Sequence, residues 1–156
     1  MEIEAGEAGI GTLVGEVDMT SRILVVDDEE KIRYLVRQGL QVGLPDCSVD
    51  VARSGQEALR SIAGKSHDLI ITDFHMPGAV DGLALIQAVR NWDAEVPVIL
   101  MTGYGSEALR AKAERFGVNH YLEKPFDLDQ LLAIAGELLA SRRKVNGSCN
   151  SPGSRR

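Results

Sequence analysis

Two groups of acidic residues follow apolar segments directly in this chain. Asp27 and Asp28 come after the run 22–26, and Asp73 ends the run 69–73. Short apolar runs of this kind, bounded by turn formers, are typical of strands buried on both faces. Taken singly, each acid could simply begin a turn. Together, at the ends of neighbouring strands, they predict a cluster of carboxylates that only a cation would neutralise.

The chemistry of this cluster favours a hard metal ion. Carboxylate oxygens combined with water suit such ions, and an incomplete cage that keeps several waters favours Mg²⁺. Two further polar side chains end apolar runs later in the chain, Thr102 after 96–101 and Lys124 after 119–123. Lys124 would then be the cation that faces the carboxylates.

The positions of these residues depend on the elements around them. Five apolar runs alternate with five helical patterns, and the runs span 22–26, 47–52, 69–73, 96–101 and 119–123. This alternation predicts a doubly wound, five-stranded parallel sheet, the flavodoxin-like (βα)5 fold with strand order 2-1-3-4-5, with helices on both faces. Open sheets of this class bind ligands at the carboxyl ends of their strands. All the polar residues named above are expected at that edge.

Composition excludes several other classes of protein. The 156 residues are 44% hydrophobic and 26% charged, with a formal net charge of -6. This charge argues against a general nucleic-acid binder, and no apolar run approaches the roughly 20 residues that a membrane span needs. Cys47 and Cys149 lie far apart and suggest neither a disulfide nor a zinc site. We expect a cytoplasmic protein.

The two ends of the chain differ from its centre. Residues 1–20 are rich in glycine and acidic residues and are predicted to form a flexible leader, with Met19 as an alternative natural start. The segment 21–140 is predicted to be a single domain. Residues 141–156 are polar and basic, and we expect them to be disordered.

Four motifs, in this order and spacing, resemble the receiver domain of bacterial two-component response regulators. They occupy residues 25–29, 72–78, 100–103 and 121–126, with the sequences VVDDE, TDFHMPG, LMTG and YLEKPF. The resemblance covers roughly residues 22 to 140. It implies a signalling domain that switches its contacts with other proteins when it is phosphorylated.

The resemblance also assigns roles to individual residues. Asp73 would be the phosphoacceptor, taking a phosphoryl group from a phosphohistidine on a sensor histidine kinase or a histidine phosphotransfer protein. Asp28, Asp73 and the backbone carbonyl of His75 would bind Mg²⁺ directly, and Asp27 would contribute through water. Lys124 would pair with a phosphoryl oxygen.

A switch is implied as well. Thr102 would donate a hydrogen bond to the phosphoryl group, and an aromatic residue, here Tyr121, would turn inward with it. The resulting surface would bind a downstream target or output domain, and a phosphorylation-dependent dimer is compatible with this. Such a domain catalyses only its own phosphorylation and dephosphorylation, and binds neither nucleic acid directly nor membranes.

Two features depart from the commonest family pattern. The loop after Pro77 is one residue longer, with Ala79 and Val80 before the next helix. His75 and Tyr104 occupy positions that vary in the family and tune hydrolysis of the aspartyl phosphate. Both side chains are bulky, so we hypothesise that they hinder the attacking water and prolong the phosphorylated state.

Other functions compete with a stand-alone receiver. The chain could be the receiver fragment of a longer transcriptional regulator or hybrid histidine kinase whose output region is missing. A docking module without phosphorylation is disfavoured by the intact acidic pair, acceptor, threonine and lysine. A metal-dependent hydrolase of the aspartyl-phosphate type usually has a second aspartate two residues after the nucleophile, where this chain has His75.

Overall fold

The protein is an open parallel sheet with helices on both faces. The computed structural model describes residues 20–149, with side chains described up to residue 143. The strands are β2 (Ser21–Val26), β3 (Cys47–Ala52), β4 (Leu69–Asp73), β5 (Val98–Thr102) and β6 (His120–Glu123). They pair in parallel in the order β3-β2-β4-β5-β6. Both the fold class and the strand order predicted from the sequence are confirmed.

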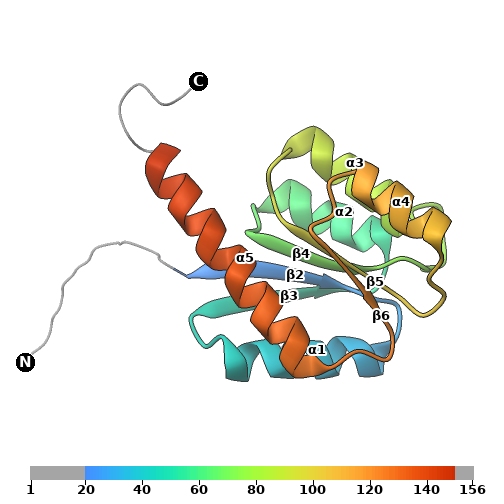
Figure 1. Ribbon diagram of the computed structural model, residues 1–156, viewed down its shortest axis with the longest axis horizontal. Helices are drawn as coiled ribbons and strands as arrows, with labels where there is room; N and C mark the ends of the chain where they lie inside the picture. The colour runs from blue at the N-terminus through green and yellow to red at the C-terminus, as the bar shows by residue number, and fades with distance from the viewer. Residues whose placement is uncertain (1–19, 150–156) are drawn as a thin grey trace, which may run out of the picture.

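In the described part of the chain, four helices connect successive strands and a fifth follows β6. They are α1 (Glu30–Gly43), α2 (Gly55–Gly64), α3 (Gly82–Trp92), α4 (Glu107–Arg115) and α5 (Leu128–Cys149). Figure 1 shows α1 and α5 on one side of the sheet and α2, α3 and α4 on the other. None of these helices is long and apolar enough to cross a membrane.

Alternating side chains of each strand fill two cores. In β2, Ile23 and Val25 face the cluster that includes α1 and α5, while Leu24 and Val26 face the cluster of α2 and α3. Because both faces are covered, the strand is apolar at nearly every position, as expected for a parallel sheet. The three central strands, β2, β4 and β5, are buried in this way and form the platform from which the polar residues project.

Side-chain caps mark the starts of α2, α3 and α4. The Ser54 hydroxyl caps α2 by accepting a hydrogen bond from the Glu57 N–H at 3.1 Å. Asp81 caps α3 by accepting from the Ala84 N–H at 2.9 Å, and Ser106 caps α4. These caps fix the length of the loops that leave the carboxyl edge of the sheet.

The end of the domain differs from the prediction. Disorder was expected from residue 141, but α5 continues to Cys149. The reason is long-range contact, because Arg142 reaches the Asp93 carboxylate at 2.8 Å and Arg143 reaches the Ser21 hydroxyl at 2.8 Å. Residues 150–156, and the predicted leader up to residue 19, lie outside the described part of the chain.

Candidate functional site

The carboxyl edge of the sheet gathers all the polar residues expected there. Asp73 is the last residue of β4 and Thr102 the last of β5. Asp27 and Asp28 follow β2 directly, and Lys124 follows β6. In Figure 1 the loops after the strands lie on the right-hand side of the molecule. Residues up to 97 positions apart in the sequence therefore share one site.

Three carboxylates form the acidic centre of this site. One carboxylate oxygen from each of Asp27, Asp28 and Asp73 lies within 4.8 Å of the others. Asp27 is fully buried and Asp73 is 5% exposed, whereas Asp28 faces solvent. Two of the three charges are thus largely removed from water.

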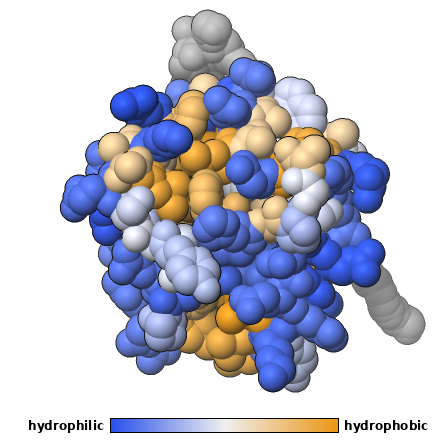
Figure 2. All heavy atoms as spheres, turned by 90° about the vertical axis from the view of Figure 1, so that its right-hand side faces the viewer, coloured by the Kyte–Doolittle hydropathy of each residue, from blue (hydrophilic) through white to orange (hydrophobic). Residues whose placement is uncertain are grey.

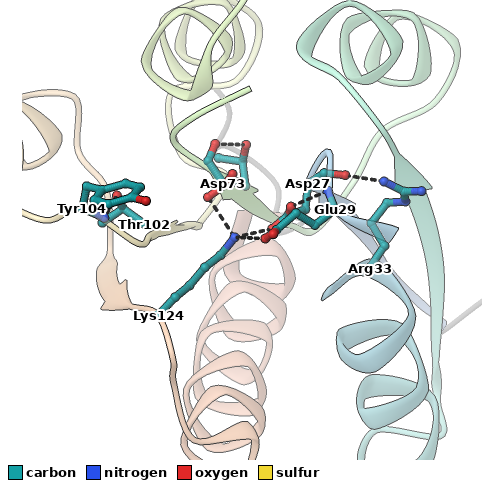
Figure 3. A network of polar contacts seen from close by, with 8 residues as sticks. Asp27, Glu29, Arg33, Asp73, Thr102, Tyr104 and Lys124 are labelled. Carbon is teal, nitrogen blue, oxygen red and sulfur yellow. Dashed lines mark hydrogen bonds and ion pairs between the residues drawn. The ribbon is translucent and has the colours of Figure 1, made fainter. Parts of the chain in front are cut away.

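Lys124 lies in the middle of the acids. Its Nζ is 2.8 Å from Asp27 Oδ2, 3.2 Å from Asp73 Oδ1 and 3.3 Å from Glu29 Oε1. Figure 3 shows the lysine reaching from its own loop toward these oxygens. One ammonium group is therefore shared among several carboxylates.

The backbone around Asp27 is fixed from several directions. Asp27 Oδ1 accepts from the Glu29 N–H at 2.9 Å, and the Asp27 N–H donates to the Ala52 carbonyl at 3.1 Å. The Asp27 carbonyl accepts from the Arg33 guanidinium at 2.7 Å, a contact visible in Figure 3. The carboxylate is consequently presented to the site in one orientation.

The single lysine does not compensate the acids. Burial, followed by the negative charge of Asp27, raises the pKa of Asp73 to about 6, although Lys124 opposes the shift. Burial also raises the pKa of Asp27 despite its bond to Lys124. The pKa of Lys124 is raised too, because the bonds and charges of Asp27 and Asp73 outweigh its own burial. The site keeps excess negative charge.

This donor set fits Mg²⁺. The converging atoms are carboxylate oxygens, the hard ligands that this ion prefers, and they carry more charge than the lysine neutralises. The side of the site toward Asp28 is open to water, which an ion that keeps part of its hydration shell requires.

The loop after Asp73 fits closely against the start of α3. A Cβ on Gly82 would lie 2.4 Å from the Asp73 carbonyl oxygen, so only glycine allows this approach. The Gly82 N–H donates to the Phe74 carbonyl at 2.9 Å. Val80 lies in the stretch where this loop is one residue longer than usual, and it packs against the core beside Gly55. The additional residue is thereby anchored.

A cleft of about 430 Å³ opens onto the acids. It is lined by Asp28, Glu29, Asp73, His75, Gly103, Tyr104 and Lys124. The His75 and Tyr104 rings meet edge to face with centroids 5.8 Å apart, and Tyr104 is 81% exposed. Figure 2 shows this side of the molecule, where hydrophilic residues cover the middle between two apolar areas.

The two residues assigned to the switch lie beside the acids and not among them. Thr102 is buried, and its hydroxyl accepts from the Tyr104 N–H at 3.1 Å. In Figure 3 Thr102 and Tyr104 stand apart from the network around Lys124. Tyr121 lies on β6, with the Arg110 guanidinium 4.5 Å from its ring centroid.

Two contacts of the site were missed in the sequence. Glu29 belongs to the acids that follow the first strand, but its ion pair with Lys124 was not predicted, and neither was the contact of Arg33 with the Asp27 carbonyl. An arginine one turn after Glu29 on α1 is a recognisable helical spacing. Its target is a backbone carbonyl, however, and backbone targets leave no trace in the sequence.

Comparison with known proteins identifies the family. The profile of the response regulator receiver domain matches residues 23–135. The chain is 36% identical over 130 residues to the C4-dicarboxylate transport transcriptional regulatory protein DctD of Pseudomonas aeruginosa, covering 82% of this chain and 27% of that protein. It is 35% identical to the response regulator MprA of Mycolicibacterium vanbaalenii, covering 85% of this chain and 56% of that one.

Solved structures agree with these relatives. The receiver domain of NtrX from Brucella abortus superposes with a TM-score of 0.70 at 33% identity, covering 76% of this chain and 98% of that one. A CheY-like receiver domain protein from Methanospirillum hungatei gives a TM-score of 0.74 at 26% identity, with 80% and 98% covered.

The matched relatives are longer proteins. This chain spans about a quarter of DctD and about half of MprA. A similar relative from Klebsiella pneumoniae, of which the chain covers 27%, is named the DNA-binding transcriptional regulator NtrC. The expectation of no direct nucleic-acid binding therefore stays a prediction about the present residues alone. Over its folded core, this chain belongs to the response regulator receiver domain family.

Proposed function

We propose that Asp73 accepts a phosphoryl group from a phosphohistidine of a sensor histidine kinase or a histidine phosphotransfer protein. The observation that carries this proposal is the environment of Asp73. Its carboxylate is nearly buried, opens onto a cleft, and lies 3.2 Å from Lys124 within an undercompensated acidic cluster. Asp28 has the wrong environment for the acceptor, since it is exposed.

The transfer itself needs little covalent chemistry from the protein. An Asp73 carboxylate oxygen attacks the phosphorus atom, the phosphorus–nitrogen bond to the donor imidazole breaks, and its electron pair returns to the ring. With a pKa of about 6, Asp73 is mostly ionised at pH 7 and above, as a nucleophile must be. Lys124 is already directed at this carboxylate, and would pair with a phosphoryl oxygen.

Asp28, Asp73 and the backbone carbonyl of His75 would hold Mg²⁺, with Asp27 acting through water. When bound, the ion would neutralise negative charge on the transferring oxygens. The protein's own contribution is to hold Asp27 in one orientation, through the Glu29 N–H and Arg33, and to keep Lys124 charged. By the same groups the domain would catalyse its own dephosphorylation.

The response would pass through Thr102 to Tyr121. The Thr102 hydroxyl accepts a bond from the Tyr104 N–H, so its own proton is free to be donated to a phosphoryl oxygen. That donation would pull the loop after β5 and with it the surface of α4, β6 and α5. In the cytoplasm this surface would bind a downstream protein, an output domain or a second phosphorylated copy.

The alternative is a receiver that forms part of a longer regulator. It is favoured by the relatives, of which this chain spans a quarter to a half. The output would then be the activity of a neighbouring region, and the domain 21–140 would act as its phosphorylation-dependent input. The chemistry proposed for Asp73 is the same in both cases.

Intact mass spectrometry tests the proposal. The protein is incubated with acetyl phosphate and Mg²⁺, beside Asp73→Asn and an EDTA control. We expect one added phosphoryl group in the wild type and none in either control. A phosphoryl group retained by Asp73→Asn would assign the acceptor to another residue, and no addition even from a phosphohistidine donor would refute the function.

A further inference from the structure

Tyr121 is partly buried, and its hydroxyl end is buried in a way that its hydrogen bonds do not explain. Its ring packs against the core between the sheet and α3, and its hydroxyl oxygen is buried without a hydrogen-bond partner among the described residues. Buried hydroxyl groups are normally paired. Other contacts must therefore keep this end of the ring out of solvent.

The first of these contacts is with Gly105, in the loop after β5. A Cβ on Gly105 would lie only 2.6 Å from the Tyr121 hydroxyl oxygen. It would also meet the Glu123 carboxylate, but that side chain is exposed and can rotate into water. The tyrosine ring is rigid and would have to swing away as a whole. Glycine is thus the residue that leaves room for the buried hydroxyl.

The second contact is with Arg110 on α4. Its guanidinium carbon lies 4.5 Å from the centroid of the Tyr121 ring, within the range of cation–π attraction. Of the residues of α4, only Leu109 and Ala113 are buried. Arg110 therefore links an otherwise lightly anchored helix to the aromatic ring of β6.

We infer that Gly105 and Arg110 together hold Tyr121 in its buried position before Asp73 is phosphorylated. The inference deepens the proposed function, because it rests on Tyr121 as the residue that reports the switch. Thr102 already binds the Tyr104 N–H, next to Gly105 in the chain. Phosphorylation would accordingly tighten an arrangement of α4, β6 and α5 that exists beforehand, and partner binding would be partly present in the resting protein.

Fluorine NMR of protein labelled with 3-fluorotyrosine measures the solvent exposure of Tyr121 directly, without a phosphodonor. The chain has three tyrosines, and the exposed Tyr34 (65%) and Tyr104 (81%) serve as internal standards. The measured quantity is the change in fluorine shift between H₂O and D₂O, which grows with exposure. We expect a small change for Tyr121 in the wild type. In Gly105→Ala it should rise to the level of the two standards.

Matched variants distinguish a specific effect of Gly105 and Arg110 on Tyr121 from a general disturbance of the fold. Gly103→Ala changes the same loop, but a Cβ there meets nothing within 4 Å, so Tyr121 should stay buried. Arg110→Ala should expose Tyr121 partly, and Arg110→Lys should restore it. A Tyr121 as exposed as Tyr104 in the wild type, or still buried in Gly105→Ala, would overturn the inference.

Acetyl phosphate treatment of the same samples keeps the two proposals apart. If Asp73 is phosphorylated but Tyr121 is exposed in the untreated wild type, the role inferred for Gly105 and Arg110 is refuted and the proposed phosphorylation of Asp73 stands. If Tyr121 is buried but no donor phosphorylates the protein, the role inferred for Gly105 and Arg110 is supported and the proposed phosphorylation of Asp73 is refuted.

Discussion

The two edges of one sheet treat buried charge in opposite ways. At the carboxyl edge, Asp27 and Asp73 share a single lysine and their pKa values are raised. At the amino edge, burial acts on Asp93 as well, but bonds from the Glu95 N–H and Arg142 win and lower its pKa. Acidic side chains are at least partly buried at both edges, but the two edges differ in how many hydrogen-bond and ion-pair partners these side chains have. Satisfied charges stabilise the fold, whereas undercompensated ones are available for chemistry.

The amino edge also holds an arginine with four backbone partners. Arg90 on α3 donates four hydrogen bonds to carbonyls, those of Val96 at 2.7 Å, Phe116 at 2.9 Å, Gly117 at 2.9 Å and Asp93 at 3.3 Å. These bonds join the end of α3 to the end of α4 and the start of β5. No comparable saturation exists around the described carboxylates of the opposite edge.

The largest effect is expected from Arg90→Ala. Hydrogen bonds to charged groups contribute about 1.5–3 kcal/mol each and are not additive, so we expect a loss of about 3 kcal/mol or more in unfolding free energy. Urea denaturation measures it, with the exposed Gln87→Ala on the same helix as control. A loss below about 1 kcal/mol would remove the contrast between the edges.

At the carboxyl edge the opposite sign is expected. Asp73→Asn removes an acid whose ionisation the fold opposes, so in EDTA at pH 7.5 it should stabilise the protein by up to about 3 kcal/mol, since one pKa unit corresponds to about 1.4 kcal/mol. The folded pKa is about 6, against an ordinary value of 3.8. The wild type therefore loses stability as pH rises through this window.

Urea unfolding of both proteins at several pH values checks this sign. The advantage of Asp73→Asn should be nearly full at about pH 7 and above, fall as pH drops through the folded value of about 6, and vanish below the ordinary value of 3.8, where the wild-type carboxyl is protonated in both states. Adding Mg²⁺ at pH 7.5 should reduce the advantage, because the ion would bind the wild type more tightly. A destabilised Asp73→Asn would contradict the picture of excess charge.

A smaller effect should follow from Asp93→Ala. The Asp93 carboxylate accepts from the Glu95 and Val96 N–H groups and from Arg142, at 2.8 to 3.1 Å. Because it is partly exposed, we expect a loss of about 1 kcal/mol at pH 7. Its lowered pKa means that this contribution is present above the ordinary value of 3.8 and disappears as pH falls through the folded value. Thermal unfolding of both proteins at pH 7 and pH 3 measures the loss of stability. The loss should be smaller at pH 3, and an equal loss at both pH values would contradict this prediction.

The smallest effect concerns the mouth of the cleft. His75→Asn and Tyr104→Ala should speed phosphate loss from Asp73 a few-fold, which corresponds to less than about 1 kcal/mol in the barrier. The reason is their position, since both rings line the cleft through which water must reach the phosphoryl group. The decay of the phosphorylated mass over time gives the rate. Equal rates in the wild type and both variants would end the hypothesis.

Topology explains why much of the site could be predicted from the sequence. Parallel strands bring their carboxyl ends to one edge, so acids after 22–26 and 69–73 had to meet Lys124 once the order of strands was known. No such rule applies to side chains that meet far from strand ends. The bond from Arg142 to Asp93 joins residues 49 positions apart, and it carries α5 beyond its predicted end.

The surroundings of Tyr121 were equally hidden. Its burial depends on the missing Cβ of Gly105 and on the rotamer of Arg110, neither of which has a periodic signal. A glycine in a loop is usually interpreted as a turn residue. Only the three-dimensional contact distinguishes a turn glycine from one that makes room for a neighbouring ring.

Calorimetric titration with Mg²⁺ tests the central claim, which is that the uncompensated acids of the carboxyl edge form a binding site for a cation. The wild type is compared with Asp28→Asn at this edge and with Asp93→Asn at the other. We predict one bound ion in the wild type, binding lost or strongly weakened in Asp28→Asn, and unchanged binding in Asp93→Asn. Equal binding in all three proteins, or none in the wild type, would contradict the account.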